Sequence, residues 1–336
     1  MRLIREYLKL IRPYGILFLG FAPVFGAVCN GQDDVFSLAL LLLIGVLGHI
    51  FVFVQNDYYD VEVDRQSKYV VQRPLTSGTL PRAHARLLFI CSFFLSVVFT
   101  GVFFFSLRCF LTLLLSFFLM TLYNRYCKKF PGMEYVLGAA VFTYGIFGAF
   151  TVSDQVSVFA LIISCIGFLQ WVFSVGISAN LKDVEFDTKL GIRTTPVRFG
   201  VHVVNHELKK PMSFVLYTYG IKLLHLIVAL LPFLFGFSSP LLFGYPFPLF
   251  GFLLLAGFLL FTTQVILTTP LDKRDQMLRY EGAHEGLALL LIPCVLASYL
   301  VEHLGNLFVF FLFVLFIAWP LFCLRFLYGK SLIPLE

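Results

Sequence analysis

The sequence predicts an all-α, polytopic transmembrane helical bundle of nine to ten spans. Of its 336 residues 59% are hydrophobic and only 13% are charged, against roughly a quarter charged in a soluble domain. Apolar runs such as 35–54 and 247–269 are long enough to cross a bilayer as helices. They lack the alternation of a membrane β-barrel, the other structure that satisfies its backbone in lipid. We therefore expect one integral-membrane domain over residues 1–336.

The apolar segments define the expected spans in chain order. The first run continues well past Leu17, too long for the core of a cleavable signal peptide, so we expect it to be retained. The last run would be an added C-terminal span. The ten segments are 13–30, 36–55, 86–106, 109–124, 134–151, 156–178, 212–236, 246–269, 286–301 and 306–328.

The basic residues predict the orientation. With the N-terminus in the cytoplasm, 23 of the 25 Lys and Arg residues fall on the cytoplasmic side. Arg108 falls on the opposite side, and Lys222 lies within the seventh span. This asymmetry is the pattern of a multi-pass membrane protein. It also accounts for the net charge of +6 without nucleic acid as a partner. Polar chemistry is then expected in the cytoplasmic loops 56–85, 180–211 and 270–285.

Several polar residues receive an interpretation that needs no function. Lys222 and His225 lie three residues apart in the seventh span, and we interpret them as snorkelling towards the interface rather than facing a cavity. The charged stretch 272–285 is interpreted as an exposed loop rather than a lid. The seven scattered cysteines lack the Cys/His spacing of a zinc site and are interpreted as small buried hydrophobes.

An acidic motif ends the second span. Asn56, Asp60 and Asp64 are spaced by four residues, so on a helix their side chains project from one face, one turn apart. Three oxygen-bearing groups in a column suit a hard divalent cation. Magnesium favours a few carboxylates together with water and substrate phosphate.

A second acidic motif ends the sixth span. Asp183 and Asp187 repeat the four-residue spacing, and the pentads 60–64 and 183–187 are nearly identical. Four spans separate them, so both should emerge on the same membrane side. Two carboxylate columns that face each other would repel without cations. The pair therefore favours a metal-bridged diphosphate clamp over two ordinary solvated loops.

Basic residues accompany each acidic motif. Arg73 and Arg193 lie in turn-rich stretches that follow the first and the second motif, and Lys182 immediately precedes Asp183. Arginine presents a planar fork to phosphate oxygens, although the same residues also serve as cytoplasmic anchors. Tyr123 and Lys128 end the fourth span in a third basic stretch.

These motifs together resemble the UbiA-type superfamily of intramembrane prenyltransferases, over residues 9–300. The family's first motif is matched by Asn56, Asp57, Asp60 and Asp64 and its Arg-Pro-x-x-Ser-Gly stretch by 73–78; the second by Lys182, Asp183, Asp187, Gly191, Thr194, Pro196 and Gly200; the Tyr and Lys signature by Tyr123 with Lys128 or Lys129; and an early Arg-Pro by Arg12 and Pro13. Phe186 stands where the family commonly has Gly, and nine spans are usual there.

The resemblance implies a terpene-synthase-like helix arrangement around a central cavity and a Mg²⁺-dependent transfer with two ions. A prenyl group would pass from an isoprenoid diphosphate to a hydrophobic aromatic or lipid acceptor in the bilayer, by ionisation of the allylic diphosphate. The implied residues are Asp60, Asp64, Asp183 and Asp187 in catalysis; Asn56, Asp57 and the same four aspartates as metal ligands; and Arg12, Arg73, Tyr123, Lys128, Lys182 and Arg193 at the diphosphate.

Other functions stay open at this point. A related branch transfers a phosphoribosyl group to a polyprenyl phosphate with the same type of motif. The prenyl acceptor could be a quinone precursor, a glycerol-phosphate lipid or a porphyrin alcohol. A secondary transporter is a different class, but it would place carboxylates near the bilayer midplane. Here the acidic residues gather at the ends of the spans instead.

Overall fold

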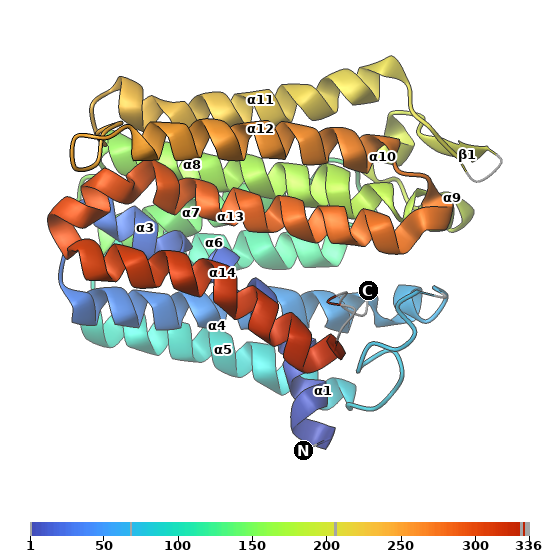
Figure 1. Cartoon of the computed structure of the whole chain (residues 1–336). Coiled ribbons are helices and arrows are strands. Elements are labelled where there is room, and N and C mark those ends of the chain that lie inside the picture. Colours follow the sequence, from blue (N-terminus) through green and yellow to red (C-terminus); the bar gives the residue numbers. More distant parts are fainter. Residues whose placement is uncertain (1, 68, 205–206, 330–331, 333–336) are drawn as a thin grey trace. The chain divides into compact units, whose positions relative to one another are not determined.

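The computed structural model describes residues 2–67, 69–204, 207–329 and 332, and helices dominate them (Figure 1). Within this part of the chain, 10 helices are long and apolar enough to cross a membrane. The predicted all-α polytopic bundle is confirmed, and the segment 306–328 forms the tenth candidate span. The chain is an integral, multi-pass membrane protein.

The chain divides into two compact units, which we describe separately. Unit 1 comprises Met1–Tyr126, Ala139–Ser164 and Ala318–Glu336, and unit 2 comprises Cys127–Gly138 and Cys165–Ile317. The prediction of a single domain stays a prediction.

Helices α1 to α6 lie in unit 1, and α7 begins in unit 2 and continues in unit 1 from Ala139. Their bounds are α1 Arg2–Ile11, α2 Ile16–Gly20, α3 Ala22–Val28, α4 Val35–Asp64, α5 Arg82–Phe103, α6 Leu107–Tyr126 and α7 Met133–Phe150, with a 3₁₀ turn η1 at Pro13–Gly15.

The remaining elements belong mostly to unit 2. They are α8 Val158–Phe173, a π-helical turn η2 Ser174–Ala179, α9 Val184–Lys189, α10 Thr195–Arg198, β1 His202–Val204, β2 Glu207–Lys209, α11 Met212–Leu234, α12 Phe247–Thr268, a 3₁₀ turn η3 Leu271–Lys273, α13 Arg274–Leu304 and α14 Asn306–Tyr328.

Helix α4 is the central element of unit 1 and carries the first acidic motif at its end. It runs without a break for 30 residues, and the Asp34 side chain caps its start by accepting from the Ser37 N–H. Its neighbours approach closely at glycines: a Cβ on Gly45 would lie 2.1 Å from the Gly20 carbonyl oxygen of α2. Small residues allow such backbone contact between membrane helices. The contact holds the N-terminal segment against α4.

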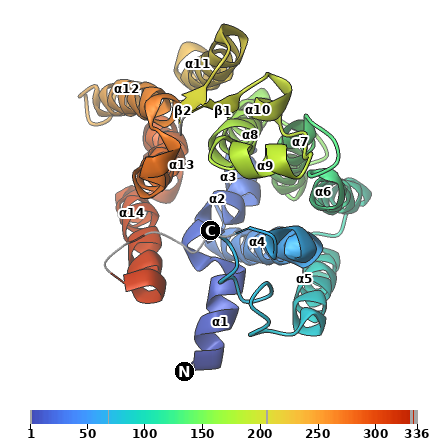
Figure 2. The ribbon, with the colours of Figure 1, turned by 90° about the vertical axis from the view of Figure 1, so that its right-hand side faces the viewer.

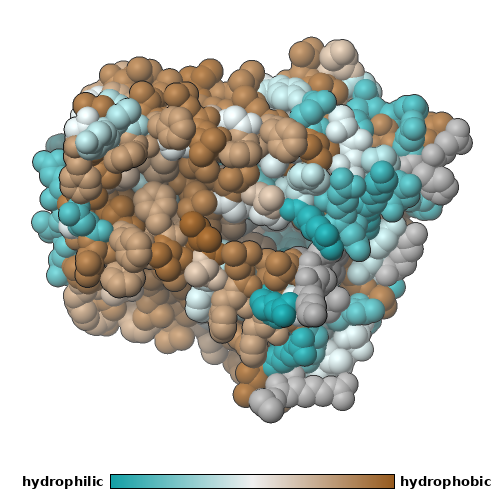
Figure 3. Space-filling view, in the orientation of Figure 1, coloured by the Kyte–Doolittle hydropathy of each residue, from teal (hydrophilic) through white to brown (hydrophobic). Residues whose placement is uncertain are grey.

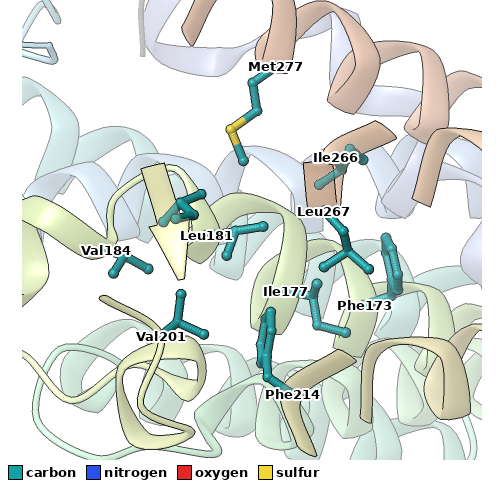
Figure 4. Close-up of a cluster of buried hydrophobic side chains, with 10 residues drawn as sticks. Phe173, Ile177, Leu181, Val184, Val201, Phe214, Ile266, Leu267 and Met277 are labelled. Carbon is teal, nitrogen blue, oxygen red and sulfur yellow. The ribbon is translucent and has the colours of Figure 1, made fainter. Parts of the chain in front are cut away.

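In unit 2, an apolar cluster supports the second motif (Figure 4). Leu181 and Val184 flank Lys182 and Asp183 in the sequence, and both side chains are fully buried. They pack in a cluster with Phe173, Phe214 and Met277, among others. Because Leu181 and Val184 point into the apolar core, the motif between them is fixed to the body of the unit.

The polar end of unit 2 is built from short elements. β1 and β2 form an antiparallel hairpin in which His202 pairs with Lys209, and α9 contacts both β1 and α10. Figures 1 and 2 show these elements together at one end of the unit. On the face drawn in Figure 3, hydrophobic side chains cover α12, and hydrophilic ones gather at the end that carries the hairpin.

The interpretation of all seven cysteines as buried is wrong for Cys91, which is exposed, and holds only partly for the half-buried Cys127 and Cys165.

Two further interpretations from the sequence are wrong. The stretch 272–285 is not a loop, because α13 already begins at Arg274. Lys222 does not snorkel: its side chain is fully buried, with Nζ 2.9 Å from Gln170 Oε1 and 3.9 Å from the centre of the Phe173 ring. Gln170 Nε2 in turn donates to Glu285 Oε2 at 3.1 Å. A polar partner inside the unit replaces the interface that the lysine was expected to reach.

Candidate active site

We describe the residues around each acidic motif separately and name each group a half-site. The first half-site lies on the last turns of α4. Because the helix is continuous through Asp64, Asn56, Asp60 and Asp64 follow one another on one face. Asp60 and Asp64 are each only 7% exposed, although they end a span. The predicted column is therefore present and shielded from bulk solvent. Buried carboxylates need compensating charge or hydrogen bonds.

Two arginines supply part of that charge. Arg73 Nη1 lies 2.9 Å from Asp64 Oδ2 and 3.4 Å from Asp57 Oδ1. Arg12 Nη2 also donates to Asp57 Oδ1. The loop that carries Arg73 closes as a turn, in which the Ser77 N–H donates to the Arg73 carbonyl at 2.9 Å. Arg12 and Arg73, predicted as diphosphate ligands, are thus brought together at Asp57.

Asp57 has a different setting from the column. It is 4% exposed and accepts from both arginines. In this arrangement its Oδ1 orients guanidinium groups. A metal-ligand role for Asp57 stays a prediction.

The second half-site is built on a broken helix. The π-helical turn η2 interrupts the sixth span just before the motif, and Asp183 stands at the N-terminus of the short helix α9. The Asp187 N–H still donates to the Asp183 carbonyl at 2.8 Å, so the four-residue spacing spans one turn. Single π-turns within α-helices are frequent at functional sites. The two nearly identical pentads therefore adopt different local structures.

Helix α13 contributes two partners to this half-site. Arg274 donates to Asp183 Oδ1 at 2.8 Å and to the Lys182 carbonyl at 2.7 Å. Lys182 Nζ lies 3.1 Å from Glu281 Oε2. Lys182 is thus held by an acidic side chain, and its predicted contact with a diphosphate stays a prediction.

Asp187 is the most deeply buried acid of the two pentads, at 1% exposure. Thr194 Oγ1 donates to its Oδ2 at 3.1 Å, whereas its Oδ1 has no hydrogen-bond partner among the described residues. The pKa of Asp187 is raised to about 6, and burial is the largest cause; Lys128 lowers the pKa, the nearby Asp183 raises it and the Thr194 hydroxyl lowers it. A bound cation would favour the ionised form.

Three further predicted residues have varied positions. Lys128 lies close enough to Asp187 to favour its ionised form. Arg193 is exposed on the segment between α9 and α10. Tyr123 is partly buried on α6, beside Asn124, whose amide donates to Gln55 Oε1 at 3.0 Å next to the first motif. The roles proposed for these three stay predictions.

Sequence reasoning missed several residues. Arg274 and Glu281 were placed in an exposed loop, although their seven-residue spacing puts them on one face of a helix. Buried Glu134 accepts from Thr195 Oγ1 and so ties α10 to the start of α7. A helix pattern that starts at Arg274 was the available signal for the first two. Glu134 offered no such signal.

The donor set fits magnesium better than a metal held by protein ligands alone. In the described part of the chain, no three His, Cys, Asp or Glu side chains converge as a ready-made metal site. Magnesium instead keeps several waters and uses one or two carboxylates with substrate phosphate. The unpaired, buried Oδ1 of Asp187 is an oxygen donor that such an ion would satisfy.

The part of the chain that the structure describes thus combines ten apolar candidate spans with carboxylates and arginines at the ends of two of them. The model of the UbiA prenyltransferase family matches residues 16–282. The chain belongs to this family, and the predicted enzyme class, prenyltransferase, is confirmed.

Curated relatives agree with this assignment. The chain is 30% identical over 204 residues to a 4-hydroxybenzoate octaprenyltransferase of Francisella tularensis, covering 60% of this chain and 70% of the relative. It is 26% identical over 203 residues to a digeranylgeranylglyceryl phosphate synthase of Pyrococcus furiosus, covering 59% and 70%.

Solved structures share the fold. A UbiA homologue of Aeropyrum pernix aligns with a TM-score of 0.62 at 14% identity, covering 86% of this chain and 98% of that one. A UbiA homologue of Archaeoglobus fulgidus, bound to DMAPP and Mg²⁺, aligns with a TM-score of 0.60 at 20% identity, covering 87% and 98%. At these identities the likeness concerns the fold.

Proposed function

We propose that this protein transfers a prenyl group from an isoprenoid diphosphate to a hydrophobic aromatic or lipid acceptor within the membrane, with Mg²⁺ as cofactor. One observation carries the proposal: each of the two acidic motifs places aspartates beside cationic side chains at the end of a span. Arg12 and Arg73 accompany the first, and Arg274 accompanies the second. Carboxylates for a metal and guanidinium groups for phosphate oxygens are what a diphosphate substrate requires.

The proposed metal ligands are Asn56, Asp60 and Asp64 for one ion and Asp183 and Asp187 for another. When bound, magnesium supplies positive charge to the diphosphate as it departs. The partly exposed guanidinium groups of Arg12 and Arg73 bind phosphate oxygens and orient the donor. They are 17% and 20% exposed, so a ligand can reach them.

The reaction breaks the allylic C–O bond and releases diphosphate. A new bond forms between the prenyl carbon and the acceptor, and the acceptor loses a proton. Arg12 and Arg73 face the charge that develops on the leaving group, where fixed donors contribute most. The apolar interior of the bundle keeps water from the reactive prenyl carbon.

The relatives support both acceptor classes. One is described as a hydroxybenzoate enzyme and the other as a glyceryl phosphate enzyme. The distribution of basic residues supports an orientation with the N-terminus and both acidic motifs in the cytoplasm. In a Cys91→Ser background, a cysteine introduced at exposed Gln72 should react with a reagent applied from the cytoplasmic side and one at exposed Asp154 with a reagent from the opposite side. The reverse pattern would contradict this orientation.

An incubation experiment tests the function. The purified protein in nanodiscs is incubated with labelled geranylgeranyl diphosphate, Mg²⁺ and each of a panel of acceptors. Mass spectrometry should find a prenylated aromatic or lipid product that disappears with EDTA. Transfer from phosphoribosyl diphosphate to a polyprenyl phosphate would contradict prenyl transfer. Substrate uptake into vesicles without any product would contradict an enzyme.

A further inference from the structure

The backbone at Arg12 adopts an uncommon conformation. Arg12 stands between α1 and η1 with φ 55° and ψ 59°, in the left-handed region. For a residue other than glycine this conformation is strained, and such strain persists where surrounding contacts impose it. Pro13 follows and cannot continue the hydrogen bonding of α1. Contacts with α4 hold Arg12 in this conformation.

His49 on α4 hydrogen-bonds to this backbone. Its Nε2 lies 3.0 Å from the Ile11 carbonyl oxygen and 3.2 Å from that of Arg12. A carbonyl oxygen only accepts, so Nε2 carries the proton and donates to both. The imidazole is fully buried. One side chain therefore holds the two carbonyls at the helix break.

The next two turns of α4 hold the arginine side chain. Phe53 packs on His49, with 4.4 Å between ring centres, and the Arg12 guanidinium carbon lies 5.3 Å from the centre of the Phe53 ring. Asp57 accepts from Arg12 Nη2. The spacing 49, 53 and 57 places all three on one face of the helix. We name these three residues the Arg12 cradle.

We infer that the Arg12 cradle consists of positioning residues that hold Arg12 ready to bind the diphosphate of the isoprenoid donor. This inference rests on the proposed function. Asp57 engages Nη2, and the guanidinium keeps other N–H groups for phosphate oxygens. The Asp57 carboxylate is 4% exposed and Arg12 is 17% exposed. An incoming oxyanion therefore meets the arginine rather than the carboxylate.

Holding the arginine in advance lowers the entropy that donor binding must lose. In a merely structural role, the cradle would affect the amount of folded protein and leave substrate binding unchanged. A carboxylate on an acceptor is also an oxyanion that Arg12 could bind. Separate titrations of donor and acceptor distinguish these two sources.

The test compares His49→Leu and Phe53→Leu with two controls. His49→Gln keeps an N–H donor for the carbonyls. Phe51→Leu changes a buried ring on the same helix that packs on Phe117 and not on Arg12. Steady-state kinetics gives the KM for the donor and the KM for the acceptor. Calorimetry measures the binding of inorganic pyrophosphate in the presence of Mg²⁺.

We expect His49→Leu and Phe53→Leu to raise the donor KM and to weaken pyrophosphate binding, each about 10-fold, as is typical when a residue that orients a ligating group is lost. The acceptor KM should not change. His49→Gln and Phe51→Leu should resemble the wild type. Unchanged pyrophosphate binding in both Leu variants, or a change in acceptor KM alone, would overturn the inference. Pyrophosphate binding does not depend on turnover, so it tests the cradle even if the wild type fails to prenylate any acceptor.

Methylguanidinium adds a second readout. In Arg12→Ala the cradle should bind this cation and recover part of the lost donor affinity. In the double variant Arg12→Ala, Phe53→Leu, the same recovery of donor affinity should require a higher concentration of methylguanidinium. Equal recovery with and without the Phe53 ring would contradict a role of that ring.

Discussion

The two acidic pentads are nearly the same in sequence, yet their surroundings differ. The first lies on an unbroken helix, where Arg73 pairs with Asp64 and shares Asp57 with Arg12. The second follows a π-turn; Asp183 pairs with Arg274, and Asp187 is buried with one oxygen that has no hydrogen-bond partner in the part of the chain that the structure describes. We propose that this difference is a division of labour. The first half-site is rich in groups for the substrate anion, and the second offers a carboxylate to a cation.

The largest effect is expected at the aspartates that begin and end each pentad, and little effect is expected at the glutamate in the middle of each pentad. Asp60→Asn and Asp187→Asn keep the shape of the side chain and remove its charge. Turnover should fall roughly 10²- to 10³-fold, the range for losing one group that stabilises developing charge. Steady-state product formation measures this.

Each pentad contains its own control for that experiment. Glu62 pairs with Arg65 and Arg82, and Glu185 pairs with Lys189, at exposed positions. Exposed pairs of this kind contribute little to stability. Glu62→Gln and Glu185→Gln should retain near-normal turnover. Equal losses in the two kinds of variant would contradict a site at the outer aspartates.

Arg274 tests whether α13 belongs to the second half-site. Arg274→Gln removes the ion pair with Asp183 and leaves that carboxylate free to reorient. We expect turnover to fall about 10- to 100-fold, as for other groups that orient metal ligands. Arg279→Gln, an exposed position on the same helix, is the control. If both variants behave alike, Arg274 has no role at the site.

A pH titration probes Asp187 directly. Its carboxyl has a pKa of about 6, so the neutral form grows as pH falls through this value, and a neutral carboxyl binds magnesium poorly. Between pH 7.5 and 5.5 the ionised fraction decreases about fourfold for a single group. The apparent KM for Mg²⁺ should therefore rise by a similar factor.

Thr194→Val sharpens this titration. The Thr194 hydroxyl donates to Asp187 and so favours its ionised form. Without the hydroxyl, the pKa rises, and the inflection should move to higher pH. An inflection that moves to lower pH, or does not move, would contradict the assignment to Asp187.

The smallest expected effect concerns the tenth span and the first half-site. Trp319 Nε1 donates to the Pro13 carbonyl oxygen at 2.7 Å, next to Arg12. Trp319→Phe removes a hydrogen bond worth about 0.5 kcal/mol at the low end of the usual range, and this bond acts on Arg12 only through Pro13, so donor KM should rise about twofold. Phe326→Leu, exposed on the same helix, is the control. No difference between the two would exclude α14 from the site.

Much of the fold was predictable because hydropathy is a local property. Each of the ten predicted segments overlaps a candidate span, and the four-residue spacing of Asn56, Asp60 and Asp64 needed only a continuous helix. The start of α13 was not recognised because its first turns are charged. Charged first turns look like a loop until a partner such as Asp183 is known.

The parts of the site that escaped prediction depend on contacts between distant segments. His49 reads as a lone histidine in an apolar span, and its role appears when α4 meets the break at Arg12. Lys222 reads as a snorkelling residue until Gln170 is seen beside it. Spacing along one helix shows which residues share a face, but not what that face meets.

One measurement tests the division of labour most directly. Mn²⁺ binding, followed by electron paramagnetic resonance in the presence of pyrophosphate, can be compared in the wild type, Asp187→Asn and Glu185→Gln. We expect two bound ions in the wild type and in Glu185→Gln, and one in Asp187→Asn. Two ions in Asp187→Asn, or none in the folded wild type, would contradict the assignment of the second half-site to a metal.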